Sequence, residues 1–436
     1  MGQRGRGGRL PGGIQLDRAR QGGGAAHISY FDYANNAVKL AGRTAAGWAV
    51  ETVDTVRWYG GFTSLVLDRA DRPHISYAGP PVGVRYARWT GAEWKFETVA
   101  DAGRHTSLAL DAADRPHMAY FDTAARSVAY GRRGDAGWAW EAVDRLADAG
   151  GFVAMALGGD RAAVAYYEAG HGDLRVARPS GGPPEVGPWA VETVDAAGDV
   201  GSHAAIALDR AGLPLVSYYD ATKGDLTVAR AAGAAWQIET VDAAGDVGQY
   251  TAIALDPAGG PWVSYYDATN RDLKVARRMA DGLQPAAWQI ETVDAAGDVG
   301  AHAALALDGE GRPHVSYYDA TNGDLKHAWL AGGAWHVETV DARGTVGVHT
   351  SLALDAAGRP GIAYAGAGGD ELRFARWTGS AWAVQTLRRG WQVAGHTALA
   401  VDARGYFTLS YHDPGWHALR VQHGAPWGAY LPLIAR

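Results

Sequence analysis

A tandem repeat of about 47 residues runs through this chain and limits what it can fold into, because periods of ~40–50 residues are typical of propeller blades. The unit is clearest between Trp288 and Leu330. It reads Trp-Gln-Ile-Glu-Thr-Val-Asp, a Gly-rich loop, Ala-Leu-Ala-Leu-Asp, a turn, His-Val-Ser-Tyr-Tyr-Asp, a second turn and Asp-Leu-Lys-His-Ala. One tyrosine marks each of nine copies: Tyr30, Tyr77, Tyr120, Tyr166, Tyr218, Tyr265, Tyr317, Tyr364 and Tyr411. One tryptophan gives the same count: Trp48, Trp94, Trp138, Trp189, Trp236, Trp288, Trp335, Trp382 and Trp427.

Each copy offers four short strand candidates separated by turn-forming residues, and this spacing leaves no room for a helix. In the copy above they are residues 305–308, 314–319, 325–328 and 335–340. The 60 glycines and 17 tryptophans suit tight turns and aromatic anchors between short strands. We therefore predict an all-β fold, a single β-propeller of nine four-stranded antiparallel blades.

The longest regular connection joins the Trp-x-Val-Glu-Thr-Val strand to the next Leu-Ala-Leu-Asp strand. A propeller needs its longest connection between the outer strand of one blade and the inner strand of the next, so Leu-Ala-Leu-Asp is predicted as the inner strand.

The chain starts with an inner strand at 14–17 and ends with an outer one, which predicts closure without strand exchange between the chain ends. An open, curved array is the alternative. Residues 1–13 are predicted as a flexible tail, and the blades as about 14–54, 62–100, 105–144, 152–195, 203–242, 250–294, 302–341, 349–388 and 396–436.

Charge and composition exclude several classes of partner and chemistry. The formal net charge of -7 argues against nucleic acid, because binding its backbone needs clustered Lys and Arg. The absence of cysteine removes disulfides, thiolate metal sites and cysteine nucleophiles. No apolar run is long enough for a transmembrane segment. The basic opening residues precede no apolar core, so no signal peptide is visible in the sequence.

Repetition also argues against catalysis, which usually needs one asymmetric set of residues. The aspartates that end the inner strands precede turns containing Gly or Pro, and we interpret them as turn caps that bind nearby backbone amides. They include Asp209, Asp256, Asp308 and Asp355. No catalytic residue is predicted, and the chain is expected not to be an enzyme.

The residue just before each inner strand is aromatic or histidine, so equivalent positions are predicted to form a ring around one mouth of the central channel. As a hypothesis of function, the ring binds an anion, a metal or a sugar. The alternative is that each side chain packs on its neighbour. The candidates for ligand binding are His105, His203, Tyr250, His302, His349 and His396. Phe62 and Phe152 occupy the same position and cannot act as ligands.

Aspartates are concentrated in the loops expected on the same side of the propeller. Asp199, Asp246 and Asp298 recur in the outer-to-inner crossings and are weak candidates for calcium binding through loop oxygens. The alternative is that they serve solubility and turn geometry. No other cofactor is predicted.

Three tryptophans outside the repeat positions are candidates for stacking against sugar rings. Trp58 and Trp391 lie in crossing loops and Trp416 lies in a hairpin turn. The alternative is that they fill gaps between blades.

The unit resembles those of repeat-built β-propellers of bacterial and archaeal surface proteins, through its Leu-Ala-Leu-Asp and His-x-Ser-Tyr-Tyr-Asp segments. It is more distantly similar to fucose-binding lectin propellers, which also pair a Tyr-rich second strand with a Trp opening the fourth. The resemblance covers about residues 14–434. It implies an extracellular or cell-surface location.

These observations favour a non-catalytic binding module that recognises carbohydrate at repeated sites. The alternative is a protein–protein scaffold in a surface assembly, and a third possibility is a glycan-processing enzyme. Binding to a glycan array favours carbohydrate recognition. A fixed protein partner together with a blank array favours the scaffold, and a single non-repeated cleft favours the enzyme. The partner is thus a carbohydrate or a surface protein, and the chain is a monomer or an oligomer of unknown size.

Overall fold

The computed structural model describes most of residues 27–423, and all of its regular elements are β-strands. The residues left outside the description are 1–26, 33–36, 45–46, 56–61, 71, 80–82, 112, 145–153, 159–160, 180–188, 234, 279–286, 356, 367–370, 390–396, 402–406, 414–417 and 424–436. The predicted tail at 1–13 therefore lies outside the described residues.

Seven of the sheets are four-stranded and antiparallel, and each follows the chain in order from one edge to the other. We call each of them a blade. The blades are β4–β7 (Phe62–Leu67, Pro73–Gly79, Gly83–Trp89, Trp94–Ala100), β8–β11 (Arg104–Leu110, Pro116–Asp122, Ser127–Gly134, Gly137–Asp144), β12–β15 (Ala154–Gly158, Arg161–Glu168, Asp173–Pro179, Trp189–Asp195), β16–β19 (Val200–Leu208, Pro214–Asp220, Asp225–Ala232, Ala235–Asp242), β20–β23 (Val247–Leu255, Pro261–Asp267, Asp272–Arg278, Trp288–Asp294), β24–β27 (Val299–Leu307, Pro313–Asp319, Asp324–Ala331, Ala334–Asp341) and β28–β31 (Val346–Leu354, Pro360–Gly366, Glu371–Trp377, Trp382–Arg389).

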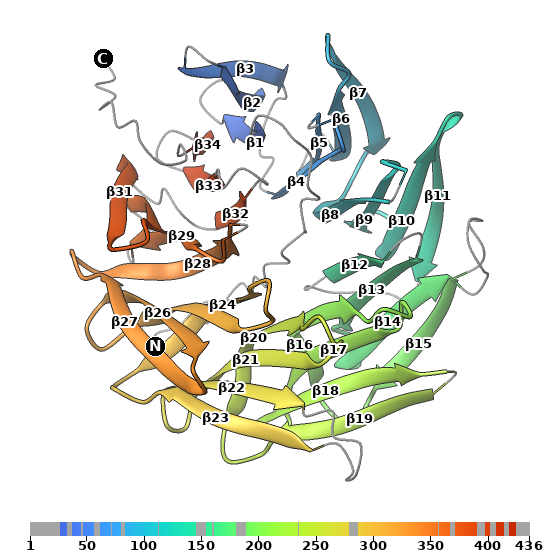
Figure 1. Cartoon of the computed structure of the whole chain (residues 1–436). Coiled ribbons are helices and arrows are strands. Elements are labelled where there is room, and N and C mark those ends of the chain that lie inside the picture. Colours follow the sequence, from blue (N-terminus) through green and yellow to red (C-terminus); the bar gives the residue numbers. More distant parts are fainter. Residues whose placement is uncertain are drawn as a thin grey trace, which may run out of the picture.

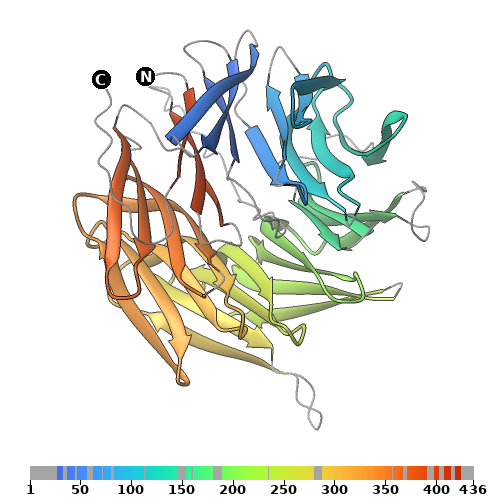
Figure 2. The ribbon, with the colours of Figure 1, turned by 45° about the horizontal axis from the view of Figure 1, so that its top comes forward.

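The sheets radiate from a central axis as the blades of a β-propeller do (Figure 1). The first strand of each blade contacts the first strand of the next, from β4 through to β28, and these strands face the axis. The fourth strands lie at the rim (Figures 1 and 2). The Leu-Ala-Leu-Asp segment is therefore the inner strand and the Trp-x-Val-Glu-Thr-Val segment the outer one, as predicted.

The first and last copies of the repeat share one six-stranded sheet. Its order is β3-β2-β1-β34-β33-β32, formed by Gly47–Thr55, Ala37–Thr44, His27–Asp32, Ala418–His423, Phe407–Asp413 and Thr397–Val401. This sheet contacts β28 through β32 and β4 through β1, so it completes the ring.

The prediction that the chain ends exchange no strand pairing is wrong at this sheet, because β1 pairs with β34 at Asp32 and Ala418. An exposed strand edge carries unpaired N–H and C=O groups, and pairing with another edge satisfies them. The strands expected at 14–17 and 427–434 lie outside the described residues. Seven four-stranded blades are observed among the described residues, and the count of nine stays a prediction.

The hydrophobic core is divided among the seams between blades, where a seam is the packing of one blade on the next. In one seam Leu273 and Val275 of β22 pack with Val315 and Tyr317 of β25. The middle strands have neighbours on both faces, so they are buried almost continuously rather than on alternate residues. This explains why the second and third strands of each copy contain so few exposed polar residues.

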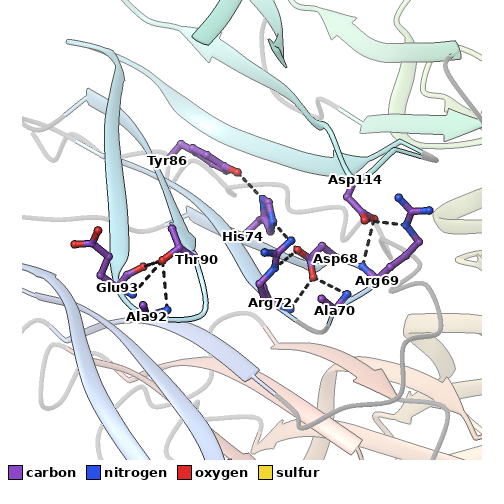
Figure 3. Close-up of polar contacts among 10 residues, drawn as sticks. All are labelled: Asp68, Arg69, Ala70, Arg72, His74, Tyr86, Thr90, Ala92, Glu93 and Asp114. Carbon is purple, nitrogen blue, oxygen red and sulfur yellow. Dashed lines mark hydrogen bonds and ion pairs between the residues drawn. The ribbon is translucent and has the colours of Figure 1, made fainter. Parts of the chain in front are cut away.

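The aspartate that ends each inner strand caps the following turn. Asp68 Oδ1 accepts hydrogen bonds from the N–H groups of Ala70 and Arg72 at 2.9 and 2.8 Å, and Oδ2 accepts one from Arg72 Nε at 2.6 Å (Figure 3). The four predicted caps make the same pair of backbone contacts, which confirms them: Asp209, Asp256, Asp308 and Asp355.

Candidate functional site

The predicted ring of histidines and tyrosine lies at a β-bulge within the inner strands. Between Ala301 and Ala304 the register of β24 shifts by one residue against β25, and His302 lies in the bulge with φ of 56°. His203, Tyr250 and His349 have φ of 55°, 55° and 52° at the equivalent bulges. A left-handed residue in a bulge redirects its side chain away from the strand's usual alternation. The bulge thus aims these rings toward their counterparts in the next blade.

The aimed side chains form a continuous arc. Ring centroids are 5.1 Å apart for His203 and Tyr250, 5.0 Å for Tyr250 and His302, and 4.6 Å for His302 and His349. Burial lowers the pKa of His203, so its imidazole is neutral at pH 7. The geometry is that of packing between neighbours, which was the alternative to ligand binding. Their role in ligand binding stays a prediction.

The other sequence-predicted candidates are not placed by the structure. His105 belongs to β8, but its side chain is not among those described. His396, Trp58, Trp391 and Trp416 lie outside the described residues.

The three candidate calcium ligands are each held between two blades. Asp246 accepts a hydrogen bond from the Tyr219 hydroxyl of the preceding blade at 2.7 Å. Its N–H donates to Thr269 Oγ1 of the following blade at 2.7 Å. The equivalent contacts join Asp199 to Tyr167 and Thr222, and Asp298 to Tyr266 and Thr321. Among the described residues no three His, Asp or Glu side chains are grouped to hold a metal ion. Calcium binding at these aspartates stays a prediction, and no formed site supports it.

We expect Tyr219→Phe to lower the free energy of unfolding by about 1 kcal/mol, because it removes one partly buried hydrogen bond to Asp246. Thermal melts of the wild type and the variant, with calcium or with a chelator, provide the measurement. Calcium is expected to leave both melting temperatures unchanged. A rise in the wild type that Asp246→Asn abolishes contradicts the structural role.

The outer strands present a second repeated group, which we call the rim site. It consists of the glutamate of one outer strand and, from the next blade, the tryptophan that opens the outer strand and an arginine that ends the third strand. At one seam, Glu239 accepts hydrogen bonds from Trp288 Nε1 and from Arg278, both at 2.7 Å. The side chains of Arg278 and Glu239 are 19% and 34% exposed, so this pair is reachable from solvent.

Other seams vary this arrangement. Glu97 binds Arg133 at 2.8 Å, and Glu291 accepts from Trp335 Nε1 at 2.6 Å. Glu192 accepts from Trp236 Nε1, with Arg178 as its ion-pair partner at 2.7 Å. The outer strands therefore carry a series of related sites that differ in whether an arginine pairs with the glutamate and in which blade supplies it.

Several buried atoms of the rim sites have no hydrogen-bond partner among the residues that the structure describes. They include Arg278 Nε, Trp138 Nε1, Trp382 Nε1 and Glu141 Oε2. Buried donors and acceptors are normally satisfied by protein, water or ligand. The rim sites thus keep hydrogen-bonding capacity that a polar molecule can use.

A third repeated group is buried deeper in the seams, and we call it the seam clasp. Tyr317 donates from its hydroxyl to Asp294 of the preceding blade at 2.6 Å, and Lys326 forms an ion pair with the same carboxylate. Tyr265, Asp242 and Lys274 repeat it, as do Tyr364, Asp341 and Arg373. The residues of these three clasps are more than 90% buried, so they hold the blades together and are not accessible to a ligand.

The sequence prediction missed the rim glutamates. Their signal was present, because a glutamate follows the marker tryptophan by three residues in most copies. It did not reveal function, since only the fold shows that this carboxylate meets the next tryptophan, 44 to 49 residues further along the chain.

Comparison with known proteins gives likeness in fold. No family model matches the chain, and no curated protein matches it. A fungal lectin from Aleuria aurantia, a six-bladed β-propeller with a novel fucose recognition mode, is 17% identical over 64% of this chain and 94% of its own, with a TM-score of 0.36. A protein from Lactobacillus plantarum is 14% identical over 73% and 95%, with a TM-score of 0.42. An ulvan lyase of polysaccharide lyase family 25 is 10% identical over 92% and 93%, with a TM-score of 0.44.

In the part of the chain that the structure describes, there is no helix with the length and apolar character needed to cross a membrane.

Proposed function

We propose that this chain is a non-catalytic binding protein that recognises carbohydrate at its rim sites. The observation that carries the proposal is the meeting of a carboxylate, an indole and a guanidinium at Glu239, Trp288 and Arg278, with the buried Arg278 Nε left unsatisfied. A carboxylate accepts hydrogen bonds from sugar hydroxyls, a guanidinium donates to sugar oxygens, and an indole face packs on C–H groups.

Repetition supports a binding role in preference to a catalytic one. Several weak sites on one rigid ring bind a polymeric or clustered ligand more tightly than one site does, because later contacts are intramolecular. As part of the same proposal, the ring has nine blades and the protein is extracellular or on the cell surface.

The proposal is tested on a panel of immobilised neutral hexoses, deoxyhexoses and N-acetylhexosamines, followed by calorimetric titration with the sugar that binds best. We expect more than one equivalent per chain, and we expect Glu239→Gln to reduce the stoichiometry by one while the other sites keep their affinity. Glu310→Gln is the matched control, because Glu310 is 71% exposed and pairs with Arg312 within a turn. A panel without binding, or a stoichiometry unchanged by Glu239→Gln, overturns the assignment.

One observation favours protein–protein scaffolding as a second candidate. The described large hydrophobic side chains that are exposed all lie on outer strands: Phe96, Ile238, Ile290 and Val337. Exposed apolar side chains at equivalent positions are typical of surfaces that contact other proteins. A fixed partner that co-purifies with the wild type and is lost with Ile238→Thr and Ile290→Thr supports this candidate.

A further inference from the structure

The β24–β27 blade contains a column of four stacked rings that begins in the interior and ends at the surface. Ring centroids are 5.3 Å apart for His314 and His327, 5.2 Å for His327 and Trp329, and 5.2 Å for Trp329 and His336. His327 is 2% exposed, whereas His336 is exposed. The preceding blade has Trp262, Val275 and Gln289 where this blade has the three histidines.

The contacts of the two buried histidines fit a pair in their neutral forms. His314 Nδ1 lies 3.1 Å from His327 Nε2, and His327 Nδ1 lies 3.2 Å from Glu338 Oε1. A carboxylate only accepts, so His327 Nδ1 carries a proton and its Nε2 accepts one from His314. An additional proton on His327 Nε2 finds an acceptor only if the proton of His314 moves from Nδ1 to Nε2, which lies 4.0 Å from Asp308, beyond hydrogen-bond distance.

The nearest carboxylate to His314 does little to compensate a positive charge on its ring. His314 Nε2 is 4.0 Å from Asp308, whose carboxylate already accepts from Arg312 and from two backbone amides. Burial, the neighbouring His327 and Arg312 lower the pKa of His314 to about 3, against the opposing effect of Asp308. Burial also lowers the pKa of His327, although Glu338 opposes it.

The pair contributes to the contact with the next blade. His327 packs edge-on against Trp382 of β31, with centroids 5.4 Å apart. At two preceding seams the indole N–H donates to a rim glutamate, from Trp288 to Glu239 and from Trp335 to Glu291. At this seam Glu338 binds His327 instead, and Trp382 Nε1 is left without a partner.

The seam has two further titratable groups. One is the arc pair of His302 from β24 and His349 from β28, with ring centroids 4.6 Å apart. The other is the clasp of Asp341 with Tyr364 and Arg373, in which Arg373 also pairs with Glu371. Burial alone raises the pKa of Asp341, but its hydrogen bonds from Arg343, Arg373 and Tyr364 lower it below the ordinary aspartate value. This carboxylate therefore stays ionised in the range where histidine titrates.

We propose that the His314–His327 pair makes the seam between the β24–β27 and β28–β31 blades acid-sensitive, so that this seam opens locally on mild acidification while its neighbours stay closed. The folded pair resists protonation and the opened pair does not. The pair's contribution to the free energy of opening this seam is thus complete above the ordinary histidine pKa of 6.5 and is lost as the pH falls below it. Release of a ligand from the adjacent rim site follows only if the proposed function holds.

Native-state hydrogen exchange at pH 7.5 and 5.0, without ligand and corrected for the intrinsic rate, tests the proposal. Peptides covering 324–341 and 371–389 report this seam, and peptides covering 225–242 and 272–278 report a control seam. The control seam has His203 of the arc against Tyr250, as this seam has His302 against His349, but it has no counterpart of the His314–His327 pair. Each histidine that titrates makes opening about tenfold more favourable per pH unit below its ordinary pKa. We expect the protection of this seam to fall at least tenfold more than that of the control seam.

Two variants separate the buried pair from histidine content in general. His314→Leu with His327→Val introduces the pair found at Leu215 and Val228, and it is expected to remove the difference between the seams. His336→Gln removes the exposed histidine and is expected to behave as the wild type. If the double variant does not fold, His327→Tyr introduces the buried His–Tyr pair seen at His74 and Tyr86. It leaves one histidine of the pair, so it is expected to reduce the difference by about tenfold per pH unit below the ordinary histidine pKa. Equal loss of protection at both seams, or a difference that is undiminished in the substituted protein, overturns the proposal.

Discussion

Asp294→Ala is expected to destabilise the protein by about 3–5 kcal/mol, because it leaves a buried lysine without its nearest counter-charge. Asp294 is 8% exposed and binds both Lys326 and the hydroxyl of Tyr317. After the substitution, the nearest remaining carboxylate oxygen to Lys326 belongs to Asp319, at 3.9 Å. The measurement is the free energy of unfolding from denaturant titration.

Asp195→Ala is the control, because among the described residues this clasp has no cation; Asp195 is partly buried, whereas Asp294 is buried. Asp195 accepts from the Tyr218 hydroxyl at 2.7 Å and from the backbone N–H of Ala197, as Asp294 does from Tyr317 and Ala296. The position of Lys326 is occupied by Thr227 in that blade. The loss expected for Asp195→Ala is about 1–3 kcal/mol, the cost of leaving a neutral hydroxyl unpaired.

Equal losses for the two variants contradict the argument that the buried cation sets the difference. The pH dependence gives a second readout. Burial alone raises the pKa of Asp294, but hydrogen bonds from Lys326 and Tyr317 outweigh it and lower the pKa. The contribution of Asp294 to the free energy of unfolding is therefore complete above the ordinary aspartate pKa of 3.8 and is lost as the pH falls below it. The difference in the free energy of unfolding between wild type and Asp294→Ala is expected to be constant from pH 7 to 5 and to narrow below pH 4.

The same blade shows how the repeat compensates a lost charge. Asp220 ends the second strand and corresponds to Asp267, which binds Lys274 at 2.9 Å. Thr227 replaces that lysine, and Lys223 in the adjacent turn pairs with Asp220 at 2.8 Å instead. The next blade has Asn270 at the position of Lys223, where it donates to Asp267. The aspartate that ends the second strand thus pairs with a lysine in both blades. The lysine comes from the adjacent turn in one blade and from the third strand in the other.

The strands and turns were predictable from the sequence because their causes are local. The aspartate before a Gly or Pro turn caps that turn with its own side chain, as Asp308 does, so its role depends on residues two and four positions away. The order of inner and outer strands followed from connection length. Both inferences need no knowledge of the neighbouring blade.

The contacts across seams were not predictable, because each joins residues that are far apart in the sequence. Nothing local indicates that Glu239 meets Trp288, or that Asp294 meets Lys326. The pairing of β1 with β34 joins the two ends of the chain, and it depends on which strand edges remain open after the other blades have formed. The sequence pattern therefore predicts a blade better than it predicts the ring.

At the bulge of the inner strand, both the local backbone conformation and the packing on the preceding blade limit which residue can be present. Gly201, Gly248, Gly300 and Gly347 lie there with φ between 101° and 111°, two residues before the histidine or tyrosine of the arc. This backbone conformation favours glycine, and the same glycines approach the preceding blade closely. They satisfy two requirements at once, which explains the Val-Gly pair in these copies.

We therefore expect Gly300→Ala to destabilise the protein by roughly 3–5 kcal/mol, the sum of backbone strain and overpacking. A β-carbon at this position lies 2.8 Å from the Cα of Leu273 and 3.0 Å from its N, which are backbone atoms of the preceding blade. Backbone cannot turn aside as a flexible side chain does, so the seam has to widen. The free energy of unfolding measures the loss, and hydrogen exchange in 272–278 locates it.

Gly332→Ala separates the two contributions. Gly332 lies in an exposed hairpin turn with φ of 61°, and a β-carbon there meets no atom within 4 Å. Its substitution is expected to cost only the left-handed backbone penalty, about 1 kcal/mol. If Gly300→Ala costs no more than Gly332→Ala, the close approach of the blades is not what requires glycine at the bulge. A larger loss confined to the β20–β23 and β24–β27 seam indicates that the spacing between blades is set at this position, beside the arc of rings.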